Sequence, residues 1–194
     1  MTETEGRKAF RGKLQIGLDN TSLDLFKTCP RKYYYAMILQ VTGAGEAVDL
    51  IFGRHIHSAL EFWDKQIAQG VPPVQAQIAT VRHTLEISGQ RAMVAGKMRW
   101  QPWESGDSQK SRESLLRTVI WYTEHFMEDP FETLVLPDGR PAVELSFRMP
   151  LPEVAGNTFY YCGHIDRLVR AMSTAMVLDR KSTRKALTPD YFEN

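Results

Sequence analysis

Apolar side chains recur at intervals of three and four residues over much of the first two thirds of the chain, the spacing of one helix face. The longest such pattern covers residues 48–69 and stops before Gly70 and two prolines, a combination that ends helices. Shorter helices are predicted over residues 23–28, 31–39, 73–88 and 111–128. We therefore expect residues 16–130 to form a mainly helical part.

Two segments lack such a pattern. Residues 1–15 are charged and without periodicity, and we expect a flexible tail there. Residues 96–109 contain tryptophan, proline and glycine without regular spacing. This second segment is predicted to be a loop.

The pattern changes from helical to alternating at Pro141, where Val143 and Leu145 alternate with Glu144 and Ser146. Such alternation predicts a strand. Two more apolar runs of strand length follow, at residues 160–169 and 176–182, separated by a short break. We expect an antiparallel three-strand meander over residues 141–183. The predicted fold is α/β, with a small mixed sheet flanked by helices in a single domain.

Acidic residues enter the last two predicted strands where apolar residues would be usual. Asp166 follows Ile165, and Asp179 follows two apolar residues. Asp179 and Lys181 are two apart, so on a strand they leave the same face. Carboxylates from neighbouring strands can hold a divalent metal, and a lysine beside them can assist phosphodiester hydrolysis. The alternative is that Asp179 and Lys181 lie on an ordinary solvated strand face and have no catalytic role. Lys181 could position or deprotonate water, or stabilise charge in the transition state.

Composition narrows the class of protein only slightly. The 194 residues carry a formal net charge of +1, with 43% hydrophobic residues, as in ordinary soluble domains. This charge does not exclude a nucleic-acid partner, because acidic metal ligands mask a local basic strip in the sum. The start resembles no signal peptide and no run approaches the length of a membrane span. We expect a cytoplasmic protein.

The strand pair carries a family resemblance. Residues 163–168 and 177–182 resemble the bipartite signature of the PD-(D/E)XK nuclease superfamily. Residues 53–61 resemble the Gly-x-x-x-His-x-x-Leu-Glu helix of its RecB-like branch, which includes the nuclease domains of RecB and AddB and the CRISPR adaptation nucleases. Residues 22–33 resemble the N-terminal Ser-x-Leu…Cys-Pro-x-x-Tyr segment of that branch. All four pieces stand in family order.

This resemblance implies a restriction-endonuclease-like core with catalytic strands. Carried over position by position, His57, Asp166 and Asp179 would bind Mg²⁺ or Mn²⁺, and Lys181 would be the catalytic lysine. Glu144 takes the place of an acidic residue that many relatives carry on the preceding strand. It could be a further ligand or an ordinary residue of a polar strand face.

The implied function is a metal-dependent deoxyribonuclease, an exonuclease in DNA recombination, repair or phage DNA processing. The alternative is a catalytically silent DNA-binding or scaffolding module that retains the fold. Nothing resembles a base-reading helix, so we expect DNA contacts that are largely independent of sequence. We also expect a recombination or helicase partner. The candidate DNA-binding residues are Arg31, Lys32, Tyr33, Arg180, Arg184 and Lys185.

The sequence departs from the family pattern in two places. Many relatives carry a four-cysteine iron–sulfur cluster, and Cys29 stands at the place of the first cysteine. Its three partners are missing and Cys162 lies on a predicted core strand, so we expect no cluster within these residues. The family's Gln-x-x-x-Tyr helix should begin where the sequence stops, at residues 191–194. We therefore expect this chain to be truncated at the C-terminus.

Overall fold

The computed structural model describes residues 16–41 and 46–181, and these group into two compact units. Unit 1 comprises Met1–Glu46 and Glu144–Ile165, and unit 2 comprises Ala47–Val143 and Asp166–Asn194. The predicted tail at residues 1–15 lies outside the described residues. Each unit is described by itself below.

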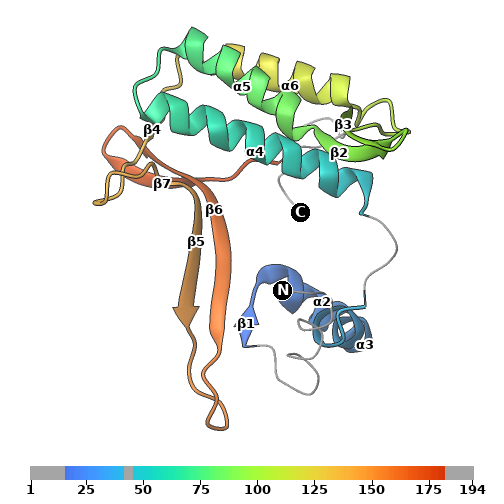
Figure 1. Ribbon diagram of the computed structural model, residues 1–194. Coiled ribbons are helices and arrows are strands. Elements are labelled where there is room, and N and C mark those ends of the chain that lie inside the picture. Colours follow the sequence, from blue (N-terminus) through green and yellow to red (C-terminus); the bar gives the residue numbers. More distant parts are fainter. Residues whose placement is uncertain (1–15, 42–45, 182–194) are drawn as a thin grey trace. The chain divides into compact units, whose positions relative to one another are not determined.

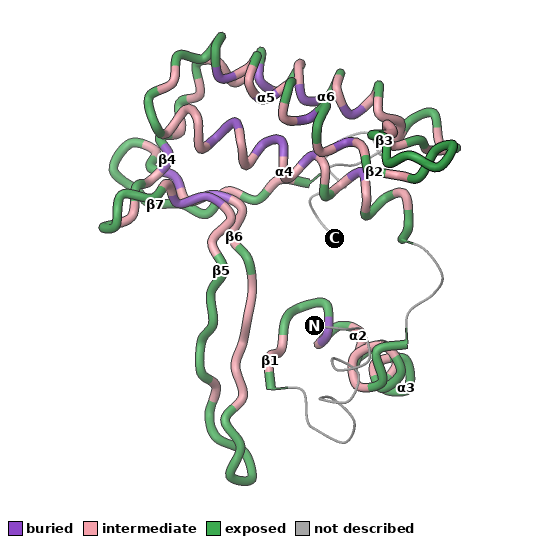
Figure 2. Tube along the Cα trace, in the orientation of Figure 1, coloured by how far each residue is buried: buried purple, intermediate pink, exposed green. Residues whose placement is uncertain are grey.

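Unit 2 contains a layer of packed helices, α4 (Val48–Ala68), α5 (Pro73–Ile87) and α6 (Arg112–His125) (Figure 1). Buried positions follow the facing sides of these helices (Figure 2). On α4 and α6 the buried apolar cluster consists of Phe52, Ile56, Ala59, Leu60, Leu115 and Val119. The helices predicted over residues 48–69, 73–88 and 111–128 are thus confirmed. Among the described residues, no helix combines the length and hydropathy that crossing a membrane requires.

A two-stranded antiparallel hairpin of unit 2 joins α5 to the segment before α6. It consists of β2 (Gly89–Val94) and β3 (Lys97–Pro102). The predicted loop over residues 96–109 is wrong for this part. Ala95 and Gly96 have φ of +48° and +74°, as a two-residue hairpin turn requires. The hairpin shows little apolar–polar alternation because most of both strands is exposed, so the usual signal of a half-buried strand is missing.

The sheet is built on β6 (Tyr160–Ala171), with β4 (Glu132–Thr133) and β7 (Thr174–Leu178) beside it in unit 2. Both pairings are antiparallel, with Thr133 opposite Val169 and Arg167 opposite Leu178. Strand β7 ends at Leu178. The expectation that residues 179 and 181 share a strand face is therefore wrong, because both follow the last strand residue.

Unit 1 begins with β1 (Gly17–Leu18), which pairs with β6 in parallel and makes the sheet mixed. Helix α2 (Asn20–Thr28) follows. It begins three residues before the predicted range of 23–28, its N-cap is Asp19, and Asp19 and Ser22 form a capping box.

The helix predicted over residues 31–39 is divided in the structure. It consists of α3 (Pro30–Tyr33) and η1 (Tyr34–Ile38), a π-helix. In η1 the Leu39 N–H donates to the Tyr34 carbonyl oxygen at 3.0 Å. A π-type turn of this kind is not visible in a pattern of apolar residues, because the pattern reports which face is buried and not which carbonyl accepts.

Strand β5 (Val143–Pro150) pairs with β6 and confirms the strand predicted from the alternation after Pro141. At the hairpin end, Leu151 N–H donates to the Phe159 carbonyl oxygen at 2.8 Å. Phe147 packs on Gly163, where a Cβ atom would lie 2.7 Å from the ring.

Candidate metal centre

His57 and Asp166 lie side by side, although helix α4 carries one and strand β6 the other. His57 Nδ1 is 3.6 Å from Asp166 Oδ2. The His57 side chain is 37% exposed and that of Asp166 is 12% exposed. The pair therefore lies at the margin of the core, where solvent reaches the imidazole while the carboxylate stays held.

Glu144 completes a group of possible ligands. His57, Glu144 and Asp166 each offer one ligand atom, and these atoms all lie within 4.8 Å of one another. One imidazole and two carboxylates suit Mn²⁺ and are acceptable to Mg²⁺, and three donors leave positions for water. These residues fit a divalent ion.

The backbone of Glu144 is unusual. Its φ is +51° within strand β5, a left-handed conformation that non-glycine residues rarely adopt. Such a conformation costs about 1–3 kcal/mol and persists where the surroundings determine it. It also interrupts the regular alternation of side chains, so the face taken by Glu144 cannot be inferred from a period of two.

Asp166 is held by the segment that follows β7. The backbone N–H of Arg180 donates to Asp166 Oδ2 at 2.9 Å. The guanidinium of Arg180 forms a fork with Asp64, with Nη1–Oδ2 2.6 Å and Nη2–Oδ1 3.0 Å. Asp64 is fully buried on α4, two turns after His57 and on the same side of the helix. Helix α4 therefore supplies the imidazole and also anchors the segment that contacts the carboxylate.

Asp179 and Lys181 flank Arg180 and contact each other. Lys181 Nζ donates to Asp179 Oδ1 at 2.9 Å, with the side chains 70% and 52% exposed, respectively. Among the described residues, Asp179 is not part of the group that could hold an ion. The metal-binding role of Asp179 and the catalytic role of Lys181 remain predictions.

Comparison with protein families matches residues 20–193 to a model described as the PD-(D/E)XK nuclease superfamily. The chain belongs to the PD-(D/E)XK nuclease superfamily. A search of curated protein sequences finds no match. Membership implies a metal-dependent nuclease fold, a hydrolytic activity and a DNA substrate, and the nucleases of this superfamily use divalent metals. The mixed α/β fold with its mixed sheet agrees with this family.

A second arginine, the buried Arg167, ties β6 of this nuclease fold to the neighbouring segment. Arg167 Nη1 donates to Asp129 Oδ2 at 2.7 Å, and Nε donates to Thr133 Oγ1 at 2.8 Å. Nη2 donates to the Phe131 carbonyl oxygen at 2.9 Å. Nη1 also lies 3.5 Å from Asp64 Oδ1. Because Arg167 follows Asp166 directly on a strand, this network fixes the position of β6 beside the candidate ligand.

Burial dominates the electrostatics of this network. Burial raises the pKa of Asp64, while the hydrogen bond and charge of Arg180, and then the charge of Arg167, oppose that rise. Burial lowers the pKa of Arg180, but hydrogen bonding and charge from Asp64 outweigh it and leave the pKa above its ordinary value. Burial also raises the pKa of Tyr122, whose ring centroid lies 5.3 Å from the Arg180 guanidinium carbon. Arg180 thus stays charged throughout the physiological range.

Asp64 belongs to none of the family motifs, but its place in the sequence carries one signal of a buried ion pair. Asp64 follows Trp63 on the apolar side of α4, and both are buried. An aspartate on such a face needs a cationic partner, since buried charges are paired. Which of the 24 lysines and arginines is that partner cannot be inferred from the helix alone.

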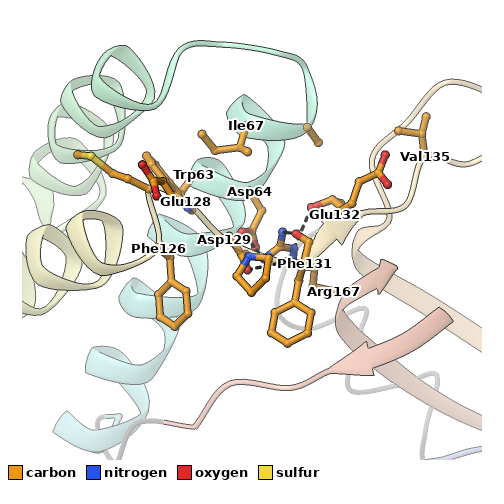
Figure 3. A pocket seen from close by; sticks show the side chains of 14 residues that line it. Trp63, Asp64, Ile67, Phe126, Glu128, Asp129, Phe131, Glu132, Val135 and Arg167 are labelled. Atoms are coloured by element: carbon orange, nitrogen blue, oxygen red, sulfur yellow. Dashed lines mark hydrogen bonds and ion pairs between the residues drawn. The ribbon is translucent and has the colours of Figure 1, made fainter. Parts of the chain in front are cut away.

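A pocket of about 420 Å³ opens beside Arg167 and Asp64 (Figure 3). Its lining includes Glu128 and Glu132, both exposed. Since acidic side chains repel phosphates, we do not assign this pocket to DNA.

The remaining predicted DNA contacts lie in unit 1 or outside the described residues. Arg31, Lys32 and Tyr33 are all in α3. Tyr33 packs edge-on against Phe26 with ring centroids 5.3 Å apart, and burial raises the pKa of Tyr33. Residues 184 and 185, predicted as basic DNA contacts, lie outside the described residues.

Proposed function

We propose that this chain is a divalent-metal-dependent deoxyribonuclease in which His57, Asp166 and Glu144 hold Mg²⁺ or Mn²⁺. The observation that carries the proposal is the approach of His57 and Asp166, which come from separate elements of the chain. Their ligand atoms and one from Glu144 lie within 4.8 Å of one another. Within a nuclease fold, the convergence of one imidazole and two carboxylates supports a metal-binding role.

The chemistry follows from these donors. When bound, the ion would neutralise charge on the phosphate and lower the pKa of a coordinated water. Asp166 accepts a hydrogen bond from the backbone of Arg180, which orients its carboxylate and leaves other lone pairs for the ion. His57 would bind in its neutral form, since only an unprotonated ring nitrogen donates to a metal.

Lys181 and Asp179 are proposed to act beside this centre. Lys181 follows directly after Arg180, whose backbone contacts Asp166. A lysine ammonium near a cleaved phosphodiester would position water or stabilise the charge that develops. In the structure this ammonium donates a hydrogen bond to Asp179. We therefore propose that Asp179 either holds Lys181 in place or becomes a metal ligand when DNA is bound.

Finer assignments rest on the motif resemblance. We propose a RecB-like exonuclease of DNA recombination, repair or phage DNA processing, working in the cytoplasm with a recombination or helicase partner. It would cut DNA largely without regard to sequence. We also propose that β5, β6 and β7 form the antiparallel meander of a restriction-endonuclease-like core.

Nuclease assays with matched variants test the activity. Purified protein with Mg²⁺ or Mn²⁺ should degrade linear DNA, while Asp166→Asn and Lys181→Met should lower the rate at least about a hundredfold. Asp166→Asn removes a charged metal ligand, and Lys181→Met removes a cation proposed to act at the phosphate. Arg117→Gln serves as the control, since this exposed arginine contacts residues of its own helix, Glu113 and the Trp121 ring. Equal cleavage by the parent and both site variants would refute the assignment.

Two further measurements separate the finer proposals. Covalently closed circular DNA should resist an exonuclease and be cut by an endonuclease. Calorimetric titration with Mn²⁺ should give a site in the parent that Asp166→Asn weakens at least about tenfold, as expected when one charged ligand is lost. A parent that binds DNA but neither binds Mn²⁺ nor cleaves would instead be the catalytically silent DNA-binding module.

A further inference from the structure

The β2–β3 hairpin contributes none of the three candidate metal ligands. Its base is nevertheless held by contacts with Ser88 and Arg112, at the ends of helices α5 and α6. Trp100 covers Gly89 so closely that an added Cβ would lie 2.1 Å from its ring. The guanidinium carbon of Arg112 lies 5.1 Å from the Trp100 ring centroid. Arg112 Nε donates to Ser88 Oγ at 3.0 Å, and Trp103 N–H donates to the Ser88 carbonyl oxygen at 2.8 Å. This anchoring matters because an isolated two-stranded hairpin is only marginally stable.

Beyond that base, the hairpin is bare. Met93 and Met98 face each other across the strands and are 65% and 61% exposed. All residues from Met93 to Trp100 are exposed (Figure 2). A large apolar side chain costs free energy when it is left in water, so two paired methionines at an anchored tip indicate a surface that contacts something.

The charge of the hairpin indicates what that partner is. Residues 87–103 contain Arg91, Lys97 and Arg99 and no acidic residue. The whole chain is almost balanced, with 24 basic and 23 acidic residues, so this excess is local. Within the described part of the chain, none of the three cations takes part in an ion pair.

The register divides these side chains between two faces. Ala92 lies opposite Arg99 and Val94 opposite Lys97, so both cations of β3 share one face. Arg91 lies opposite Trp100, on the face that also carries the two methionines. Both faces of the tip therefore combine basic and apolar side chains, and the larger apolar ones lie on the face of Arg91. This combination suits a nucleic acid, because cations contact phosphates and apolar side chains pack against sugars and bases.

We propose that the β2–β3 hairpin is a DNA-binding element of this nuclease, in which Arg91, Lys97 and Arg99 contact the phosphate backbone. A two-stranded ribbon is narrow enough to enter the major groove of a duplex. The side chains on both of its faces would then meet the groove walls. The inference rests on the proposed function in that DNA is taken as the substrate, and it adds a binding surface remote in sequence from every motif residue.

Fluorescence anisotropy with labelled duplex and single-stranded oligonucleotides, in EDTA so that no cleavage occurs, tests this surface. The triple variant Arg91→Gln, Lys97→Gln, Arg99→Gln should bind at least about tenfold more weakly than the parent. The slope of log affinity against log salt should fall by about two to three, since each lost phosphate contact contributes roughly 0.7–0.9 to that slope. Circular dichroism should show unchanged folding because the tip is exposed.

The matched control removes three exposed cations from other parts of unit 2, namely Arg82, Arg117 and Arg140. It changes the net charge equally but keeps the three hairpin cations, so it should leave most of the affinity intact. Equal weakening by the two triple variants would overturn the inference, because only overall charge would then matter. If the parent cleaves DNA and the hairpin variant binds DNA as tightly as the parent, the hairpin inference is overturned. The proposed nuclease function would still stand.

Two other outcomes would also refute it. A parent that neither binds nor cleaves DNA would refute the proposed function, and the hairpin inference with it. If Met93→Ser with Met98→Ser dissolves an oligomer of the parent, as seen by sedimentation, and DNA affinity stays unchanged in the triple cation variant, the hairpin is a protein interface. Loss of affinity in the hairpin variant alone, with the lower salt slope, would support DNA binding.

Discussion

Replacing Arg180 by methionine removes a charge whose side chain is only 12% exposed, while keeping a side chain of similar length. The guanidinium forms two bonds to the fully buried Asp64, at 2.6 and 3.0 Å. Removing one partner of a buried pair costs about 3–5 kcal/mol, since the other charge stays behind without solvent. Arg167 remains 3.5 Å from Asp64 and offsets part of that cost. We therefore expect Arg180→Met to lower the free energy of unfolding by about 3 kcal/mol.

Urea unfolding followed by tryptophan fluorescence measures this effect, because all four tryptophans lie in unit 2. With a slope of about 2 kcal/mol per molar urea, the midpoint should fall by about 1.5 M. The control Arg117→Met breaks an exposed pair with Glu113 and a contact with the exposed Trp121 ring, and the exposed pair should cost about 0.3–0.5 kcal/mol. A loss below about 0.5 kcal/mol for Arg180→Met would refute the idea that this pair is buried and intact.

A double-variant cycle separates the pair from the size of its side chains. Asp64→Leu alone should destabilise strongly, because it leaves the Arg180 guanidinium unpaired in the core. The double variant with Arg180→Met should cost at least about 1 kcal/mol less than the two single losses combined, since residues in direct contact are coupled. Additive losses would mean that the two residues act independently. Mn²⁺ affinity should fall in Arg180→Met too, because the segment that contacts Asp166 loses its anchor.

Local features supply three further predictions. Glu144→Gly should leave the urea midpoint unchanged or higher, because φ is +51° there, yet calorimetry should show weaker Mn²⁺ binding. Gly163→Ala should speed hydrogen exchange in β6, since the new Cβ would meet the Phe147 ring at 2.7 Å, at a cost of about 1–2 kcal/mol. Asp19→Ala should raise exchange in α2 by removing its bond to the Ser22 N–H, worth about 1 kcal/mol. Unchanged hydrogen exchange in Gly163→Ala would contradict the close packing of Phe147 on Gly163. Unchanged exchange in Asp19→Ala would contradict the role of Asp19 as the cap of α2.

The local elements were largely predictable because their signals lie within a few residues. The apolar period located α4 within one residue at its C-terminal end, where Ala68 is the last helical residue. The alternation after Pro141 located β5 in the same way. The hairpin at residues 89–102 was missed because it buries no face and so leaves no period to detect.

The same distinction between local signals and long-range packing applies to the candidate site. His57 and Asp166 could be named from motifs, and the family match agrees with those motifs. The partner of Arg180 could not be named from the sequence, because Asp64 lies far away along the chain. Their pairing depends on how α4 packs near the end of β7. The positive φ of Glu144 is equally invisible to a period of two. Spacing along the chain thus determined which residues could carry the chemistry, whereas long-range packing decided which of them meet, because contact between distant segments depends on the whole core.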